Sequence, residues 1–224
     1  MKRLMDTYRR SVYDRTFLVA VGASLVFLCA GLAASFYAGI YATDRASNYV
    51  ADLVLSNTPV FNVDGLFIYG TELFVIFLIA VAVWLPRTIP FTAFSLGLFY
   101  FVRAGFISLT HIGPFPDRIA LDPGSVMTRF IGGGDLFFSG HTGAPFLLAL
   151  IFWQVRPLRY IFLAWSGFFA VVVLLGHLHY SIDVASAYFI TYTIFILSGF
   201  LFKGYHALFQ QGLEAGGPEP VIKT

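Results

Sequence analysis

Two short segments of the chain combine histidine, serine and aspartate in patterns that could carry out chemistry. One reads Ser-Gly-His at residues 139–141, and the other runs over residues 177–183. In the second segment His179 and Asp183 are four residues apart, which places them on one face of a helix. A carboxylate in that position can hold one imidazole nitrogen, so that the tautomer is fixed and the other nitrogen is free as a nucleophile.

The Ser-Gly-His segment suits the binding of a phosphate group. Gly140 allows a close approach of the backbone, and the first N–H groups of a helix that begins here favour an anion. Two histidines can divide phosphoryl transfer, because one can attack phosphorus while the other protonates the leaving oxygen. The guanidinium of Arg103 is suited to clamp phosphate oxygens. Acidic residues near these positions are too few for a two-metal centre, and we expect neither a metal ion nor a cofactor.

The composition indicates that this chemistry takes place in a membrane. The 224 residues are 58% hydrophobic and only 12% charged, with 26 Phe. In soluble domains about a quarter of the residues are charged. A net charge of +2 is too small for a protein that binds nucleic acid. The single cysteine, Cys29, excludes an intrachain disulfide. We therefore expect an integral membrane protein with one domain.

Six apolar segments are long enough to cross a membrane as helices of about 20 residues. The predicted fold is therefore all-α, a bundle of six transmembrane helices that forms a catalytic domain over residues 16–205. A basic segment, residues 1–15, precedes this domain, and a tail that we expect to be disordered, residues 206–224, follows it. The six expected spans are residues 16–43, 65–86, 88–116, 136–155, 160–180 and 184–202.

The positions of Lys and Arg predict the orientation of the bundle. Most basic residues lie in the N-terminal segment, in alternate connections on the same side, and in the tail. Cytoplasmic loops carry this excess, so both termini are expected to be cytoplasmic. The loops near residues 44–64, 111–135 and 179–183 then face the periplasm, the cell exterior or an organelle lumen.

Placing a titratable side chain at membrane depth costs free energy, so such residues usually have a function. On the expected topology, six of them from five spans lie at similar depth below the outer face, either at the outer end of a span or about two helical turns inside it. Such a cluster indicates an active site near that face. Its members are Glu72, Arg103, His141, His177, His179 and Asp183.

Several polar residues near this face also have a structural interpretation. Arg103 could contact phosphate or pair with Glu72 inside the bundle, and Glu72 could instead satisfy a helix end. His177 could support the site or be an interfacial residue, and Asp135 could cap the fourth helix or line the site. Tyr180 lies near the end of a span, where aromatic residues often anchor a helix in the interface.

The two histidine segments resemble those of the type 2 phosphatidic acid phosphatase (PAP2) superfamily, and in particular its sphingomyelin synthase branch. In that branch a Cys-Gly-Asp sequence, here Gly-Gly-Asp at 133–135, precedes Ser-Gly-His-Thr, here at 139–142. A His-x-His-Tyr-Thr-x-Asp-Val sequence follows, which reads His-Leu-His-Tyr-Ser-Ile-Asp-Val at 177–184. The branch also has an arginine with a threonine seven residues later, matched by Arg103 and Thr110. The Lys-x₆-Arg-Pro sequence of the phosphatase branch is absent.

The resemblance implies a membrane enzyme that moves a phosphorylated head group between lipids. It implies that His179 forms a phosphohistidine, that Asp183 orients this histidine, and that His141 protonates the departing diacylglycerol oxygen and then activates the incoming alcohol. In sphingomyelin synthase the donor is phosphatidylcholine and the acceptor is ceramide, while relatives transfer phosphoethanolamine or phosphoinositol. Membrane lipids are therefore the expected partners, with no nucleic acid, and no oligomeric state is predicted.

Two other functions remain open from the sequence. A lipid phosphate phosphatase would use the same triad with water as the acceptor. A transporter or a non-catalytic scaffold is a third hypothesis, although no inverted repeat or pair of broken helices is visible. The residues predicted as catalytic are His141, His179 and Asp183, and those predicted to bind substrate are Arg103, Asp135, Ser139, Gly140, His177 and Tyr180.

Overall fold

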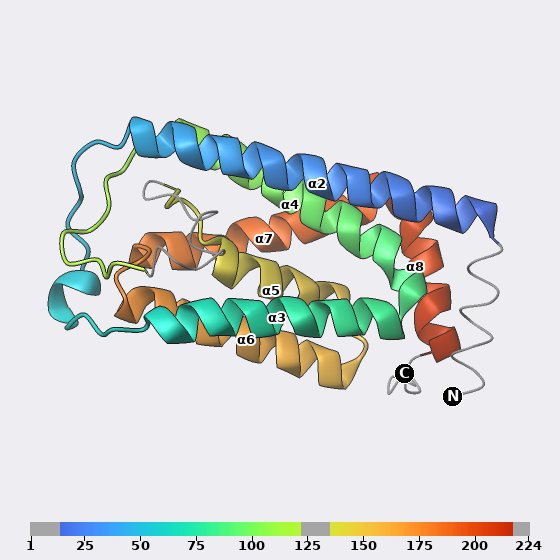
Figure 1. Cartoon of the computed structure of the whole chain (residues 1–224). Helices are drawn as coiled ribbons and strands as arrows, with labels where there is room; N and C mark the ends of the chain where they lie inside the picture. Colours follow the sequence, from blue (N-terminus) through green and yellow to red (C-terminus); the bar gives the residue numbers. More distant parts are fainter. Residues whose placement is uncertain (1–13, 122–134, 217–224) are drawn as a thin grey trace.

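Helices account for all the regular structure in residues 14–121 and 135–216, which the computed structural model describes. The long helices run side by side in an elongated bundle with connections at its two ends (Figure 1). The expected all-α fold is thus confirmed for these residues. In chain order the helices are α2 (Arg15–Asp44), η1 (Leu55–Asn57), α3 (Asp64–Trp84), η2 (Pro86–Thr88), α4 (Ile89–Leu109), α5 (Gly140–Ile151), α6 (Arg156–Leu175), α7 (Ser181–Leu201) and α8 (Lys203–Gly216).

Five of these helices are long and apolar enough to cross a membrane, namely α2, α3, α4 together with η2, α6 and α7. Several such helices indicate a multi-pass membrane protein. The expected fourth span, residues 136–155, contains only the 12-residue helix α5. At 1.5 Å per residue α5 is about 18 Å long, which is short of a hydrocarbon core of about 30 Å. The predicted count of six spanning helices is therefore not confirmed.

The helix α5 is short because the chain before it enters the bundle without helical structure. Leu136, Phe138 and Ser139 are buried, and the carbonyl of Phe138 accepts a hydrogen bond from Nε of Arg103 at 2.9 Å. Irregular backbone at membrane depth is tolerated where protein groups satisfy its polar atoms. The hydroxyl of Ser139 then accepts the N–H of Thr142 and caps α5. As a result, α5 begins inside the bundle, beside the side chain of Arg103.

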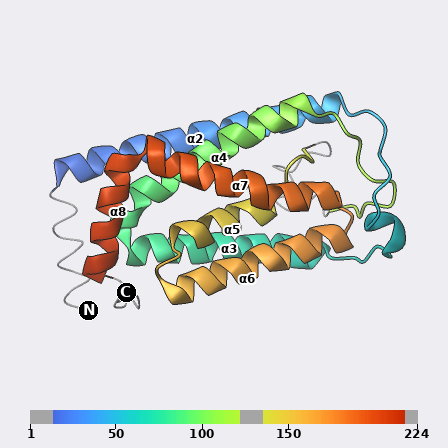
Figure 2. The same cartoon turned by 180° about the vertical axis from the view of Figure 1, so that it is seen from behind.

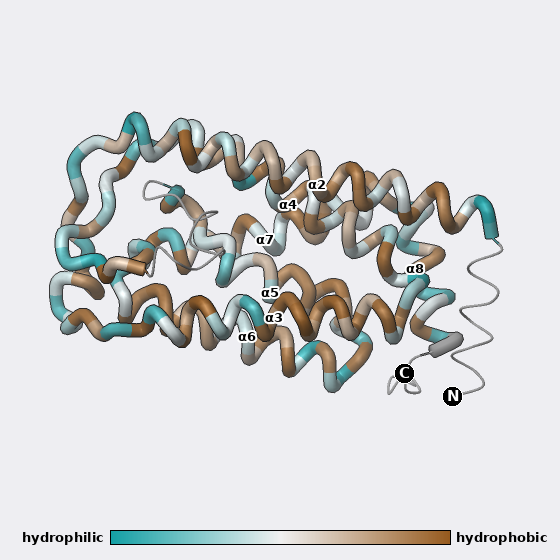
Figure 3. Tube along the Cα trace, viewed as in Figure 1, coloured by the Kyte–Doolittle hydropathy of each residue, from teal (hydrophilic) through white to brown (hydrophobic). Residues whose placement is uncertain are grey.

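The two ends of the bundle differ in character (Figures 1 and 2). The loop end contains the segments 45–63, 110–121 and 176–180. Hydrophilic residues gather there, whereas hydrophobic residues follow the helices (Figure 3). The orientation of these ends across the membrane stays a prediction. The other end, which we call the basic end, carries Arg87, Arg156, Arg159 and Lys203 in or beside its connections.

Residues 206–216, for which we expected a disordered tail, instead form most of α8. This helix lies across the basic end and packs against η2 and α4. Phe209 is its anchor, since it is 1% exposed and its ring contacts those of Phe91 and Phe152. A helix with apolar residues on one face is stabilised by burying that face. Residues 1–13 and 217–224 of the predicted terminal segments lie outside the described residues.

Small residues bring α2 and α4 into close contact. A Cβ atom at Gly31 would lie 2.6 Å from the carbonyl oxygen of Gly97, so only glycine fits there. Close approach through small residues is a common way for membrane helices to associate. The contact matters for the site because it brings Ser35 of α2 within 3.2 Å of the guanidinium of Arg103.

Candidate active site

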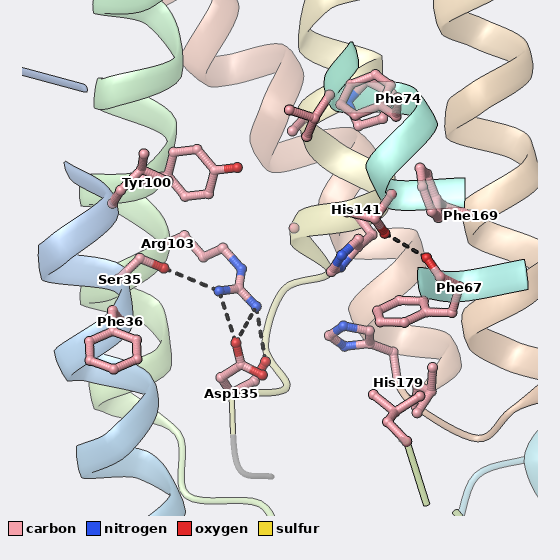
Figure 4. Close-up of a pocket in the computed structure, with 18 of the residues that line it drawn as sticks. Ser35, Phe36, Phe67, Phe74, Tyr100, Arg103, Asp135, His141, Phe169 and His179 are labelled. Atoms are coloured by element: carbon pink, nitrogen blue, oxygen red, sulfur yellow. Dashed lines mark hydrogen bonds and ion pairs between the residues drawn. The ribbon is translucent and has the colours of Figure 1, made fainter. Parts of the chain in front are cut away.

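A cavity of about 360 Å³ lies between the helices in the half of the bundle toward the loop end (Figure 4). This volume is within the range of small-ligand sites. Its apolar part includes Leu32, Phe74 and Val75, which lie on α2 and α3 further from the loop end. Both Leu32 and Val75 are exposed. The polar residues that line the cavity are Ser35, Thr71, Tyr100, Arg103, Arg118, Asp135, His141 and His179.

His179 lies in the connection between α6 and α7 and is nearly buried at 7% exposure. Its Nδ1 is 2.8 Å from the carbonyl oxygen of Leu136 and 3.4 Å from a carboxylate oxygen of Asp183. A carbonyl oxygen only accepts hydrogen bonds, so Nδ1 carries a proton, and in the neutral ring Nε2 is then the nitrogen with the lone pair. The tautomer that leaves Nε2 free as a nucleophile is therefore set by the shorter contact, which is to Leu136.

Asp183 lies beside His179 and also caps the start of α7. The side chain is fully buried, and Oδ2 accepts the N–H of Tyr180 at 2.9 Å as part of a capping box at the start of α7. Oδ1 has no hydrogen-bond partner among the described residues. The carboxylate thus caps the start of α7 and places negative charge 3.4 Å from Nδ1 of His179, where a positive charge would develop during nucleophilic attack.

His141 is the second residue of α5 and lines the cavity beside His179 (Figure 4). Its ring packs between those of Phe67 and Phe169, with centroid distances of 4.4 and 5.4 Å. These contacts come from α3 and α6, so three helices together set the orientation of the imidazole. The two histidines are thus adjacent on the cavity wall although 38 residues separate them in the chain.

The guanidinium of Arg103 is held by several acceptors at once. Nη2 donates to the backbone carbonyl of Asp135 at 2.9 Å, and the same residue's carboxylate forms an ion pair with Arg103 at 3.3 Å. Gly140 lies directly against the guanidinium, because a Cβ atom there would be 3.1 Å from Nε. Arg103 therefore pairs with Asp135 and not with Glu72, which is exposed on α3.

Arg118 is a cavity residue that the sequence analysis missed. It lies in the segment 110–121 and lines the cavity together with Arg103 and Asp135. Burial lowers the pKa of Arg118, and the carboxylate of Asp135 opposes this shift. No spacing relates Arg118 to the histidine segments, and in the sequence it counted only as a loop charge. Within the described ranges, no three His, Cys, Asp or Glu side chains are grouped so that they could hold a metal ion.

Three residues predicted to bind substrate lie outside the cavity wall. Ser139 is buried as the cap of α5. His177 has a φ of 52° and directs Nε2 to the carbonyl of Thr58 at 3.2 Å. The hydroxyl of Tyr180 donates to the carbonyl of Gly113 at 2.8 Å. These side chains hold the loop end around the site, while the cavity itself is lined by Arg103, Asp135, Gly140, His141 and His179 among the predicted residues.

Comparison with known proteins gave a match over part of the chain. Residues 132–200 match the family model described as PAP2 superfamily C-terminal. This match supports membership of the PAP2 superfamily. The matched region contains His141, His179 and Asp183. Since the PAP2 superfamily comprises phosphatases and related phosphotransferases, the match supports an enzyme with membrane lipids as plausible substrates. No curated protein and no solved structure gave a significant match.

Proposed function

We propose that this PAP2-like protein transfers a phosphorylated head group from a glycerophospholipid to a lipid alcohol such as ceramide. The observation that carries the proposal is the shared cavity of His141, His179 and Arg103, which continues into an apolar part between α2 and α3. The polar part offers a nucleophile, an acid and a phosphate clamp. The apolar part, at membrane depth, suits the hydrocarbon of a lipid.

The proposed reaction has two steps. In the first, Nε2 of His179 attacks phosphorus, the bond from phosphorus to the diacylglycerol oxygen breaks, and protonated His141 gives its proton to that oxygen. In the second, neutral His141 takes the proton of the incoming hydroxyl, whose oxygen attacks phosphorus. The phosphorus–nitrogen bond breaks, and both histidines regain their starting states. Asp183, 3.4 Å from Nδ1, stabilises the charge on the ring of the intermediate.

A lipid phosphate phosphatase is the second candidate, and the match to the PAP2 superfamily favours it. The same two histidines would act, with water in place of the lipid alcohol in the second step. The two functions differ in whether product formation depends on an added alcohol.

The decisive experiment uses the purified protein in vesicles with head-group-labelled donor lipids. Phosphatidylcholine, phosphatidylethanolamine and phosphatidylinositol are offered one at a time, with and without ceramide, and phosphatidic acid is assayed for phosphate release. We expect a labelled sphingolipid that forms only when ceramide is present. Release of phosphate from phosphatidic acid, without any alcohol-dependent lipid product, would instead support the phosphatase.

A trapping experiment addresses the covalent intermediate. Without an acceptor, brief incubation with a labelled donor should leave acid-labile, base-stable label on the wild-type protein, as expected for a phosphohistidine. The variant His179→Asn should remain unlabelled. Equal labelling of the two proteins would rule out His179 as the nucleophile.

A further inference from the structure

Asp52 connects the loop-end segment 45–63 directly to the first residue of α7. It is nearly buried at 7% exposure, and its Oδ2 accepts both the N–H of Ser181 at 2.7 Å and the hydroxyl of Ser181 at 2.9 Å. Its Oδ1 accepts the N–H groups of Val54 and Leu55 at 2.8 and 3.0 Å. Both oxygens are thus fully used, and one carboxylate caps η1 and α7 at the same time.

These contacts keep the Asp52 carboxylate charged. Burial alone raises the pKa of Asp52, but the hydrogen bonds from Leu55, Ser181 and Val54 outweigh burial, so the net pKa lies below the usual value. A negative charge at the start of α7 is favourable, because the first N–H groups of a helix carry partial positive charge. Asp52 therefore acts as an ionised cap from outside the helix.

Asp52 is linked to the histidine site through Ser181 and the residue before it, Tyr180. The preceding residue, Tyr180, gives its N–H to Asp183, and that same carboxylate lies 3.4 Å from Nδ1 of His179. The N–H of Ser181 is one of the four donors that a helix start leaves without intrahelical partners. Without Asp52 this N–H loses its acceptor, and we expect the carboxylate of Asp183, two residues further along the chain, to turn toward it and away from His179.

Two further contacts join the same loop-end segment to the turn before α7. The carbonyl of Thr58 lies 3.2 Å from Nε2 of His177, and the N–H of Val50 donates to the hydroxyl of Tyr180 at 3.3 Å. Together with Asp52, these contacts hold residues 177–181 from one side. Among these contacts, only that of Asp52 uses a carboxylate to accept a backbone N–H at the start of α7, as Asp183 also does.

We propose that Asp52 is a positioning residue of the active site: by accepting the N–H of Ser181, it keeps the carboxylate of Asp183 beside Nδ1 of His179. This inference rests on the proposed role of His179 and applies equally to transfer and to hydrolysis, since both begin with attack by the same nitrogen. A residue of segment 45–63, far from the histidine segments in the chain, would thus influence catalysis.

The test compares Asp52→Asn with Ser181→Ala. The asparagine keeps the size of the side chain but loses the charge and one of the two acceptor oxygens, so it cannot serve both Ser181 and the N–H groups of Val54 and Leu55. The alanine removes only the hydroxyl and leaves the N–H bonded to Asp52. We expect Asp52→Asn to lower kcat about ten- to a hundredfold, as small misplacements of catalytic groups do, with little change in KM. The acidic limb of its kcat–pH profile should move to lower pH, because protonated His179 loses the nearby carboxylate. Ser181→Ala should remain within about threefold of wild type.

A rescue variant separates positioning from a merely structural role. Ser181→Pro removes the competing N–H, and proline suits the first position of a helix. Tyr180, at φ −70° and ψ 156°, already has the extended backbone that a residue before proline requires. In the Asp52→Asn background, Ser181→Pro should restore most of the lost kcat. An Asp52→Asn protein with lowered Tm but unchanged kcat and pH profile would overturn the proposal, as would failure of the proline to rescue.

A second readout keeps this test independent of the proposed function. Carbethoxylation of His179 by diethyl pyrocarbonate, followed by mass spectrometry, reports how readily the neutral imidazole forms, whether or not a lipid turns over. Its pH dependence should move to lower pH in Asp52→Asn and return in the double variant. Wild-type protein that is inactive on every donor would refute the proposed function, whereas an unshifted modification profile would refute the role of Asp52.

Discussion

The two halves of the bundle are held together by different kinds of contact. Toward the loop end, Arg103, His179 and Asp52 are fixed by short hydrogen bonds, most of them to backbone atoms. Toward the basic end, large rings such as those of Phe162 and Phe209 fill the interior and are almost fully buried. Hydrogen bonds are directional and fix a few atoms around a cavity, while ring packing fills volume. Changes in the first half should therefore affect turnover, and changes in the second half should affect stability.

The largest expected effect is that of His179→Asn. The amide nitrogen of asparagine can take the place of Nδ1 and keep the hydrogen bond to Leu136, but nothing replaces Nε2. Lipid turnover should fall by about 10⁴-fold or more, since the nucleophile is lost. Tm in detergent should change by only a few degrees. Substantial residual turnover of the same lipid would contradict the assignment of His179.

Phe162→Ala is the matched change in the other half. The ring is fully buried and contacts those of Phe74, Phe77 and Phe152, so its removal should cost about 3–5 kcal/mol of stability. Turnover per folded molecule should stay within a few-fold of wild type, because Phe162 does not line the cavity and touches its wall only at the ring of Phe74. Thermal unfolding and active-site titration of the same sample would check both statements. A loss of turnover without a loss of stability would contradict the division between the halves.

Arg103→Lys should reduce turnover by roughly 10²-fold, about 2.7 kcal/mol. A lysine keeps the charge but loses the fork that reaches Phe138, Asp135 and Ser35 together. Steady-state kinetics with a phosphodiester donor measure the effect. Asp135 is left with a weaker partner, so Asp135→Asn in the lysine background should cost less than it does alone.

Gly31→Val should have a smaller effect, which lowers both stability and turnover. The valine side chain would collide with the backbone of Gly97 and push α2 from α4, at a cost of about 1–3 kcal/mol. Because α2 carries Ser35 to Arg103, turnover should also fall by a few-fold. Gly22→Val, where a Cβ atom meets nothing within 4 Å, is the control and should change neither quantity.

The smallest expected effect is on the pH dependence of stability. Since the pKa of Asp52 is lower in the folded protein than its usual value, its contribution to stability is complete above about pH 4–5 and is lost as pH falls through the folded value. Wild type should therefore exceed Asp52→Asn by a few degrees in Tm at pH 6. This difference should shrink below about pH 4. A constant difference over this range would show that charge does not contribute.

Local patterns in the sequence were enough to predict part of this protein. Long apolar runs predicted the membrane helices, because about 20 residues of one character are needed to cross a bilayer. The spacing of His179 and Asp183 predicted that they would lie close together on one face of a helix. They are 3.4 Å apart, but His179 lies in the connection before α7, so the two residues do not share a helix. The histidine segments also predicted the PAP2 resemblance, which the family match supports.

The sequence by itself thus determined the membrane-helical character and the types of residue at the site, since both depend on the side chains of short, continuous stretches of the chain. Only the tertiary structure decided that Arg103 pairs with Asp135, that the Leu136 carbonyl sets the tautomer of His179, and that Arg118 joins the cavity. It also decided that α5 begins inside the bundle. Backbone carbonyls are the same in every residue and leave no pattern in a sequence, so the groups that they hold become known only when distant segments are packed together.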